Sequence, residues 1–262
     1  MRYFMLILLS LFAMSGCTQQ ISQRDAEYRL VWQEDFNGRT IDTTSCSVNK
    51  RAPYSWSKYM SSHKSLYRVR NGYLRLYARR NKGLEPADTA QYLTGGVSTK
   101  GRRNVRLGKV EVRVRIKGAQ GTWPAVWLLV DGPVSTENVR YSEIDILEYL
   151  NRNDFVYQTV HSYYTLHTNT KAEHSTKAPI RTGKWNTYAA EIRENEVILS
   201  VNGEETYRYY RMEGEEGQFP YGIASYLMLD MQVGGTWVKT VDPKTFPAYM
   251  DIDWVKMYSL EQ

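Results

Sequence analysis

Three carboxylates interrupt an apolar, strand-like run at residues 141–150, YSEIDILEYL. Side chains of a β-strand alternate between its two faces, so Glu143 and Asp145 share one face and the isoleucine between them points to the other. Glu148 follows Glu143 by five residues and would fall on the opposite face of a regular strand. A one-residue β-bulge near Ile146–Leu147 would return it, and bulges are common beside active sites. The spacing therefore predicts a bulged strand that gathers three carboxylates on one face.

This arrangement suits the hydrolysis of a glycosidic bond. With a rise of roughly 3.3 Å per residue, the two glutamate backbones lie about 13 Å apart, and side chains that lean inward can close the carboxyl gap to roughly 5 Å. A retaining mechanism needs that gap: Glu143 would attack the anomeric carbon, Glu148 would protonate the leaving oxygen, and Asp145 would hydrogen-bond the nucleophile. Crowding should raise at least one pKa, as a general acid requires. The alternative is a set of solvent-facing charges on a half-exposed strand.

Strand signals dominate the chain from Tyr28 onward. Apolar and polar residues alternate in YLRLYAR, KVEVRVRIK, ENEVILSVNG and DIDWVKMY, and Gly, Asn, Asp and Pro separate such segments. Asn202–Gly203 is typical of a tight hairpin turn. A chain of 262 residues that is 42% hydrophobic can bury one sizeable core. We therefore predict an all-β fold of two stacked antiparallel sheets.

The first 27 residues are predicted to lie outside that fold. Arg2 and the apolar run Phe4–Met14 are typical of an export signal that is too short to span a bilayer. MSGC resembles the bacterial lipobox, which implies a lipoprotein signal peptide over residues 1–16 and lipidation of Cys17. Residues 17–27 would then be a tether, and residues 28–262 the catalytic domain.

This predicts an exported bacterial lipoprotein of the cell envelope, at the outer membrane, which touches the membrane only through its N-terminal lipid. The alternatives are an ordinary cleaved secretory peptide or a Cys17–Cys46 disulfide. With only two cysteines, a disulfide framework is excluded, and Cys46 is expected to be a buried thiol.

Charge gives weaker guidance. The net charge of +6 would suit an anionic partner, and a sulfated or sialylated glycan is one option. The cationic residues are nevertheless scattered along strands and form no nucleic-acid stripe: Arg68, Arg70, Arg75, Arg79, Arg113 and Arg115. We expect a solvated sheet face, no nucleic-acid partner and a monomer.

The motif EIDILE resembles the E-x-D-x-x-E signature of glycoside hydrolase family 16. Further matches to that family follow in the same order along nearly all of the mature chain: Leu30–Gly38, Arg68–Ala78, Gly108–Lys117, Gly121–Leu129, Gly183–Ile192, Leu229–Gly235 and Met250–Tyr258. The resemblance implies a concanavalin-like jelly-roll β-sandwich with an open substrate groove on its concave sheet.

Aromatic residues are candidates for stacking on sugar rings in such a groove. Trp123 and Trp127 share a face by alternation and are predicted to line it, although either could belong to the core. Trp237 follows two glycines and is predicted to be a loop-borne stacking residue. Tyr54 and Trp56 lie in the aromatic-rich segment RAPYSWSKYM, which would form a wall of the groove or be a plain surface loop.

The resemblance also implies polar site residues. It puts His161 near the acid/base, and Asp230 and Gln232 on the groove floor. Many relatives have Asn at the position of Asp230, so this acid would either bind a hydroxyl pair or raise the pKa of Glu148. The other histidines fall in loop-like sequence and are predicted to have no site role: His63, His167 and His174.

The chemistry needs no cofactor. The resemblance allows a structural calcium on the convex side, near Gly38 and Asp253, although the sequence contains no dedicated calcium loop.

The bulged motif implies an endo-acting retaining β-glycoside hydrolase. Within the family, NRNDFVYQTVHSYYT and the lipoprotein layout look most similar to endo-β-1,4-galactosidases of gut bacteria, which act on poly-N-acetyllactosamine in mucin O-glycans and keratan-like chains. The alternatives are an endo-β-1,3-glucanase (laminarinase) or an algal galactanase. A different class also stays open, because the same jelly roll serves in lectins: the chain would then be a surface glycan-binding lipoprotein. A purely structural envelope protein would have no glycan affinity.

Overall fold

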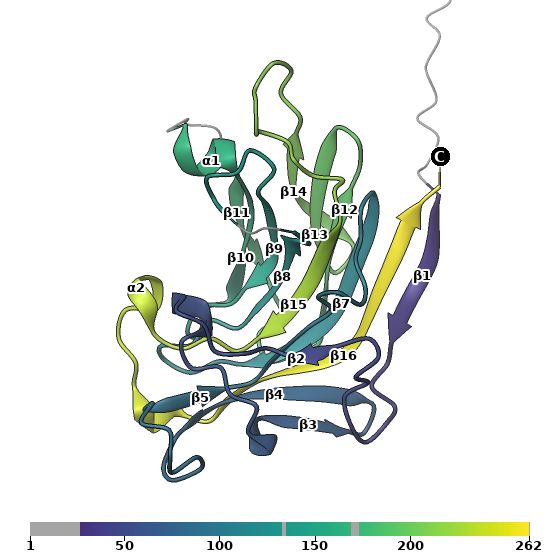
Figure 1. Ribbon diagram of the computed structural model, residues 1–262. Coiled ribbons are helices and arrows are strands. Elements are labelled where there is room, and N and C mark those ends of the chain that lie inside the picture. Colours follow the sequence, from purple (N-terminus) through teal and green to yellow (C-terminus); the bar gives the residue numbers. More distant parts are fainter. Residues whose placement is uncertain (1–26, 133–134, 169–172, 262) are drawn as a thin grey trace, which may run out of the picture.

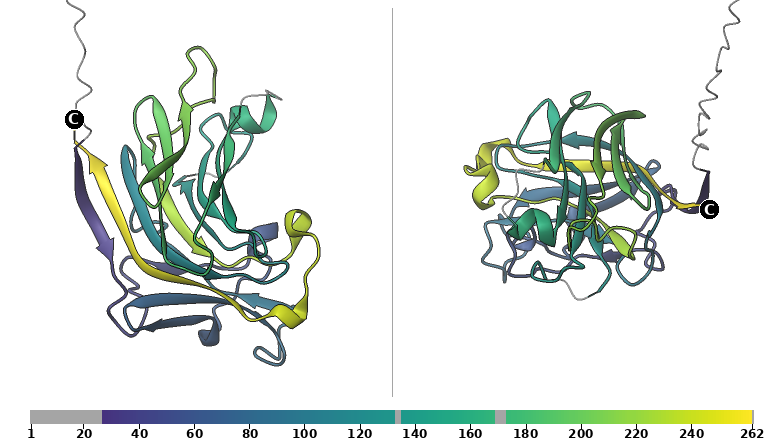
Figure 2. Two further views of the ribbon diagram at one scale, coloured as in Figure 1. Left: turned by 180° about the vertical axis from the view of Figure 1, so that it is seen from behind. Right: turned by 90° about the horizontal axis from the view of Figure 1, so that it is seen from above.

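The computed structural model describes residues 27–132, 135–168 and 173–261. The predicted signal peptide, Cys17 and the tether up to Ala26 lie outside these residues. Two antiparallel sheets form the molecule, stacked face to face and curved in the same sense (Figures 1 and 2). The all-β prediction is therefore confirmed.

The outer sheet has the order β14-β13-β12-β7-β16-β4-β3, with β1 paired to β16 and β5 paired to β4. Its strands are β1 (Tyr28–Glu34), β3 (Tyr67–Arg70), β4 (Tyr73–Arg80), β5 (Tyr92–Thr94), β7 (Gly108–Lys117), β12 (Asn186–Ile192), β13 (Glu196–Val201), β14 (Glu204–Tyr210) and β16 (Ala248–Leu260).

The inner sheet has the order β11-β10-β9-β8-β15-β6-β2. Its strands are β2 (Ser47–Val48), β6 (Gly96–Ser98), β8 (Ala125–Val130), β9 (Ser142–Glu148), β10 (Phe155–Ser162), β11 (Ser175–Pro179) and β15 (Ser225–Asp230). The acidic motif is β9, an interior strand of this sheet between β10 and β8.

Among the described residues, helices are confined to short pieces of the connections: η1 (Ser55–Ser57), η2 (Lys64–Leu66), α1 (Tyr163–His167), α2 (Gly235–Val238) and η3 (Pro243–Thr245). None of the helices in the described part of the chain has the length and hydropathy that a membrane crossing requires.

The core lies between the two sheets and follows from the alternation in the sequence. Every second residue of β7 is buried, beginning with Gly108 and Val110, while the residues between them are at least partly exposed. On the inner sheet, Val156 and Val160 of β10 enter the same core, and both are fully buried. The hairpin of β13 and β14 turns at Asn202 and Gly203, which both have positive φ, as the sequence predicts.

The solvent face of the outer sheet carries the strand arginines, as expected, but several are paired. Asp251 of β16 is fully buried and accepts hydrogen bonds from Arg75 and Arg115. Asp253 pairs with Arg113 at 2.5 Å. These pairs link the side chains of β4, β7 and β16 across the sheet. Tyr28 of β1 lies opposite Leu260 of β16, so the two ends of the described chain lie side by side (Figure 1).

Candidate active site

A groove with a volume of about 890 Å³ crosses β9, β8, β15, β6 and β2 of the inner sheet. Its floor is a cluster of buried apolar and aromatic side chains: Ala125, Trp127, Leu129, Tyr141, Tyr226 and Met228, with Trp56 packed against them. Glu143, Asp145 and Glu148 all line the groove. Three carboxylates thus stand beside a floor that suits the apolar faces of sugar rings.

A bulge in β9 brings the acids together. The pairs Asp145–Thr159 and Glu148–Tyr157 leave one residue of β10 opposite two of β9, and the register with β8 shifts at the same place. The two opposed residues, Ile146–Leu147, both point into the core. Glu148 consequently returns to the groove face. The predicted bulge is confirmed, at the predicted position.

Burial raises the pKa of all three acids. Burial, and after it the charges of Glu143 and Asp230, together raise the pKa of Glu148 to about 8. Burial also raises the pKa of Glu143, against which a hydrogen bond from Tyr141 acts. Asp145 has a pKa well above its usual range because it is buried beside Glu148 and Glu143. Glu148 is therefore suited to carry a proton at neutral pH, and the hydrogen bond favours an ionised Glu143.

Tyr141 is a site residue that the sequence analysis missed. Its hydroxyl donates a hydrogen bond to Glu143 Oε2, and its ring is part of the groove floor. Burial and the charge of Glu143 raise the pKa of Tyr141, so the hydroxyl stays protonated and remains a donor. It stands two residues before Glu143, on the same face by alternation, and this spacing was the available signal.

Replacing Tyr141 by Phe removes the donor while keeping the ring. The pKa of Glu143 is then expected to rise, because the hydrogen bond favours the ionised form. The acidic limb of the kcat/KM profile should move to higher pH, with activity at pH 5 falling roughly tenfold, the equivalent of one charged hydrogen bond. Tyr149→Phe removes a hydroxyl from a core residue and is the control. An acidic limb that stays in place in Tyr141→Phe would contradict this role.

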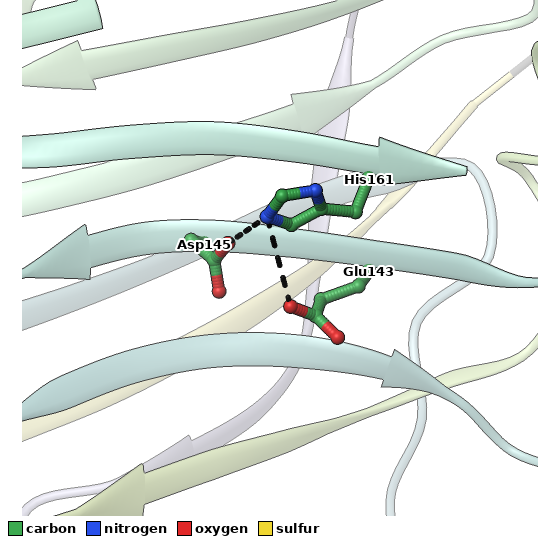
Figure 3. Close-up of side chains that lie close together, drawn as sticks. All are labelled: Glu143, Asp145 and His161. Carbon is green, nitrogen blue, oxygen red and sulfur yellow. Dashed lines mark ion pairs between the residues drawn. The ribbon is translucent and has the colours of Figure 1, made fainter. Parts of the chain in front are cut away.

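His161 of β10 faces the acids from the neighbouring strand (Figure 3). Its Nε2 lies 3.4 Å from Asp145 Oδ2 and 4.0 Å from Glu143 Oε1. Burial lowers the pKa of His161 to about 4, and His174 acts in the same direction, so the ring is neutral at physiological pH. A neutral Nε2 can accept a hydrogen bond from a protonated Asp145. His161 thus lies beside the predicted nucleophile and its helper, and not near the acid/base as the resemblance implied, because it is opposite Glu143 in the strand pairing whereas Glu148 is opposite Tyr157.

His174 is closer to the site than the sequence suggests. Its ring centroid lies 5.8 Å from that of His161, and its backbone carbonyl accepts a hydrogen bond from Val160. His174 falls in loop-like sequence and was therefore predicted to have no site role. The pairing of β10 with the segment before β11 brings the two histidines together.

Asp230 does not line the groove, so the structure favours the second of its two predicted roles, in which it raises the pKa of Glu148, over the binding of sugar hydroxyls. Its side chain is fully buried beneath the groove. Trp127 Nε1 donates to one carboxylate oxygen at 3.0 Å, and Gln232 Nε2 donates to the other at 2.8 Å. Burial raises the pKa of Asp230 to about 7. Asp230 therefore orients two groove residues, and its charge contributes to the raised pKa of Glu148.

Gln232 itself lines the groove. Its Oε1 is buried and has no hydrogen-bond partner among the described residues. Trp123 also lines the groove, and its buried Nε1 likewise has no partner in the described part of the chain. Each of these two groove residues therefore holds one buried polar atom without a partner among the described residues.

The predicted aromatic residues come together at two places. Trp237 lies on the one-turn helix α2 and packs edge-on against Trp123, with 5.5 Å between centroids; it is 39% exposed. Tyr54 and Trp56 come from the segment around η1 and line the groove, and Trp56 packs edge-on against Trp127 at 5.2 Å. The aromatic segment before β3 is therefore part of the groove wall.

The calcium near Gly38 and Asp253 stays a prediction. The Asp253 carboxylate already has a cationic partner in Arg113, which a metal ion would have to displace. Cys46 is buried with a free thiol, and burial raises its pKa to about 12. Lipidation of Cys17 concerns a residue outside the described part of the chain.

The fold and the paired acids define a class, the glycoside-cleaving enzymes with a jelly-roll scaffold. The family model described as Glycosyl hydrolases family 16 matches residues 27–256. The chain therefore belongs to that family.

Relatives within the family differ in substrate. A keratan-sulfate endo-1,4-beta-galactosidase of Sphingobacterium multivorum is 29% identical over 237 residues, which are 89% of this chain but only 56% of that relative. The laminarinase from Rhodothermus marinus superposes with a TM-score of 0.77 at 26% identity, over 91% of this chain and 100% of the other. Another solved structure superposes with the same TM-score at 26% identity, over 89% of this chain and 100% of the other. Its description concerns endo-acting O-glycanases that prominent members of the human gut microbiota express to initiate mucin breakdown.

Proposed function

We propose that the chain is a retaining endo-β-glycosidase with Glu143 as nucleophile and Glu148 as acid/base. The observation that carries this proposal is the β9 bulge, which turns both glutamates toward one groove. In the first step the Glu143 carboxylate attacks the anomeric carbon and forms a glycosyl ester. Glu148 gives its proton to the departing glycosidic oxygen.

In the second step, Glu148 is a carboxylate and removes a proton from water. That water attacks the anomeric carbon and releases Glu143, so two inversions give net retention. Protonated Asp145 can donate a hydrogen bond to Glu143 when the nucleophile regains its charge. The aromatic floor holds the sugar rings on either side of the bond.

For the substrate, we propose the β-1,4-galactosidic bond of poly-N-acetyllactosamine, as found in mucin O-glycans or keratan-like chains. Support comes from the similarity to the keratan-sulfate endo-1,4-beta-galactosidase and to the solved structure linked with mucin breakdown. The equal TM-score of the laminarinase keeps a β-1,3-glucan substrate as the second candidate. An algal galactan is the remaining option within the family.

The test is to incubate the purified protein with mucin O-glycans, keratan, laminarin, agarose and mixed-linkage glucan, and to identify the products by mass spectrometry. The proposal expects oligosaccharides with galactose at the new reducing end. Laminarin fragments alone would favour the second candidate. Binding of a glycan without any cleavage would favour a surface lectin.

We also propose that the protein is exported and anchored through a lipid on Cys17. The support is the apolar N-terminal run and the MSGC sequence. Labelling with a fatty-acid probe in the producing bacterium is expected to tag the parent chain and not Cys17→Ser. Tagging of both chains would contradict the anchor.

A further inference from the structure

A buried glutamine crosses the core beneath the β9 bulge. Gln158 lies on β10 in the row that faces the core, between Val156 and Val160, and it is fully buried. An amide in an apolar core costs free energy unless both of its ends are hydrogen-bonded. The hydrogen bonds of Gln158 therefore indicate its role.

One end of the amide holds the bulge. A bulge leaves the extra residue of one strand without its regular ladder partner. Gln158 is the single β10 residue opposite the two bulged residues of β9, and its Nε2 donates a hydrogen bond to the Ile146 carbonyl oxygen at 2.8 Å. The side chain thus supplies a bond at the point where the backbone ladder is interrupted.

The other end of the amide is fixed to the opposite sheet. Thr206 Oγ1 of β14 donates a hydrogen bond to Gln158 Oε1, and the same hydroxyl lies 3.0 Å from the carbonyl oxygen of Leu199 on β13. β14 and β13 belong to the outer sheet and β10 to the inner sheet. The amide therefore links the bulge to the outer sheet, and its orientation is set by both neighbours.

The register of β9 decides where Glu148 points. A one-residue slip in a strand moves every following side chain to the other face. Without the bulge, Glu148 would point into the core, and a retaining reaction would lose its proton donor. We propose that Gln158, held by Thr206, is the positioning residue that keeps β9 bulged and so keeps Glu148 in the groove. This inference rests on the proposed function for its catalytic consequence.

The experiment compares three variants of the full chain. Gln158→Met keeps the length of the side chain and removes both hydrogen bonds. Thr206→Val removes only the link to the outer sheet. Val156→Ala is the matched control, because it weakens the same core row of β10 without touching the bulge.

Two readouts separate positioning from plain stability. The first is kcat on the glycan that the parent chain cleaves. The second is the pKa of Glu148, measured by carbon-13 NMR titration of the carboxyl groups, with the signal assigned by its loss in Glu148→Gln. In the parent chain burial and neighbouring acids hold this pKa at about 8.

We expect Gln158→Met to lower kcat roughly 100-fold, the scale of a misplacement of about 1 Å, and to move the pKa of Glu148 away from the parent value. Val156→Ala should lower Tm and keep both the kcat and the pKa of the parent. The proposal would be overturned if Gln158→Met left the pKa of Glu148 unchanged, or if Gln158→Met and Val156→Ala lost kcat equally.

If Gln158→Met does not fold, Thr206→Val takes its place. The proposal is supported if the pKa of Glu148 in Thr206→Val differs from that of the parent chain, and it is refuted if the two values are the same. The NMR titration does not require turnover. A parent chain that cleaves no glycan would therefore refute the proposed function, while the titration still decides the role of Gln158.

Discussion

Replacing Glu143 by Gln is expected to lower kcat at least about 10⁴-fold while leaving glycan affinity close to that of the parent. The carboxamide has nearly the same shape as the carboxylate, so it fills the same place beside Tyr141, but it cannot form the glycosyl ester. Steady-state kinetics gives kcat, and isothermal titration calorimetry with the preferred oligosaccharide gives the affinity.

Glu111→Gln is the matched control for this change. Glu111 lies on β7, on the solvent face of the outer sheet, where it pairs with Lys109 at 3.1 Å. The same chemical change there should leave kcat at the parent value. Retention of parent activity by Glu143→Gln would remove Glu143 as the nucleophile, and equal losses in both variants would point to damage to the fold.

Replacing Glu148 by Gln is expected to lower kcat by about 10²–10⁴-fold, the usual contribution of a positioned general acid. The pH profile should also change. A general acid must carry its proton, so parent activity should decline as the pH rises through about 8, the pKa that burial and the nearby acids give Glu148. The variant has no proton to lose at this position, and its residual activity should show no such decline.

A substrate with a good leaving group checks the same assignment independently. An aryl glycoside whose phenolate departs without protonation needs little help from Glu148 in the first step. The loss of activity in Glu148→Gln should therefore be much smaller for the release of the phenolate than for the natural glycan, whereas Glu143→Gln should be inactive on both. Equal losses of Glu148→Gln on both substrates would contradict the acid role.

The part of the site that alternation determines could be predicted from the sequence. Glu143 and Asp145 fall on one face because they are two residues apart, and the five-residue offset of Glu148 requires a bulge, which lies at Ile146–Leu147 as predicted. Trp127 was found in the same way, since it alternates along β8 with the core residues Val126 and Leu128. A period of two is a strong signal wherever one face of a strand is buried.

Contacts between segments that are far apart in the sequence could not be predicted. The hydrogen-bond donors to Asp230 are Trp127 on β8 and Gln232, so the burial of Asp230 depends on how β15 and β8 pair. Gln158 was not predicted as a positioning residue, although it is a polar residue between two core valines of β10. Its hydrogen bond from Thr206 comes from the opposite sheet, and the sequence does not show which residues of the two sheets face each other. A polar residue in a core row is a signal of buried hydrogen bonding.

Substrate choice depends on features of a different kind. The groove runs from the acids toward β2, and its far wall includes Tyr54 and Trp56 from a connection between strands. Connections vary among relatives more than strands do, and they carry specificity. The family relatives accordingly share the fold and differ in the glycans named for them.

The central claim is that two glutamates on one bulged strand act in a double displacement. The most direct measurement is proton NMR of the reaction mixture within the first minutes, before mutarotation, which identifies the anomer formed at the new reducing end. The account predicts the β-anomer first, with the α-anomer growing in later. Initial release of the α-anomer would mean a single displacement, and Glu143 could then not be a covalent nucleophile.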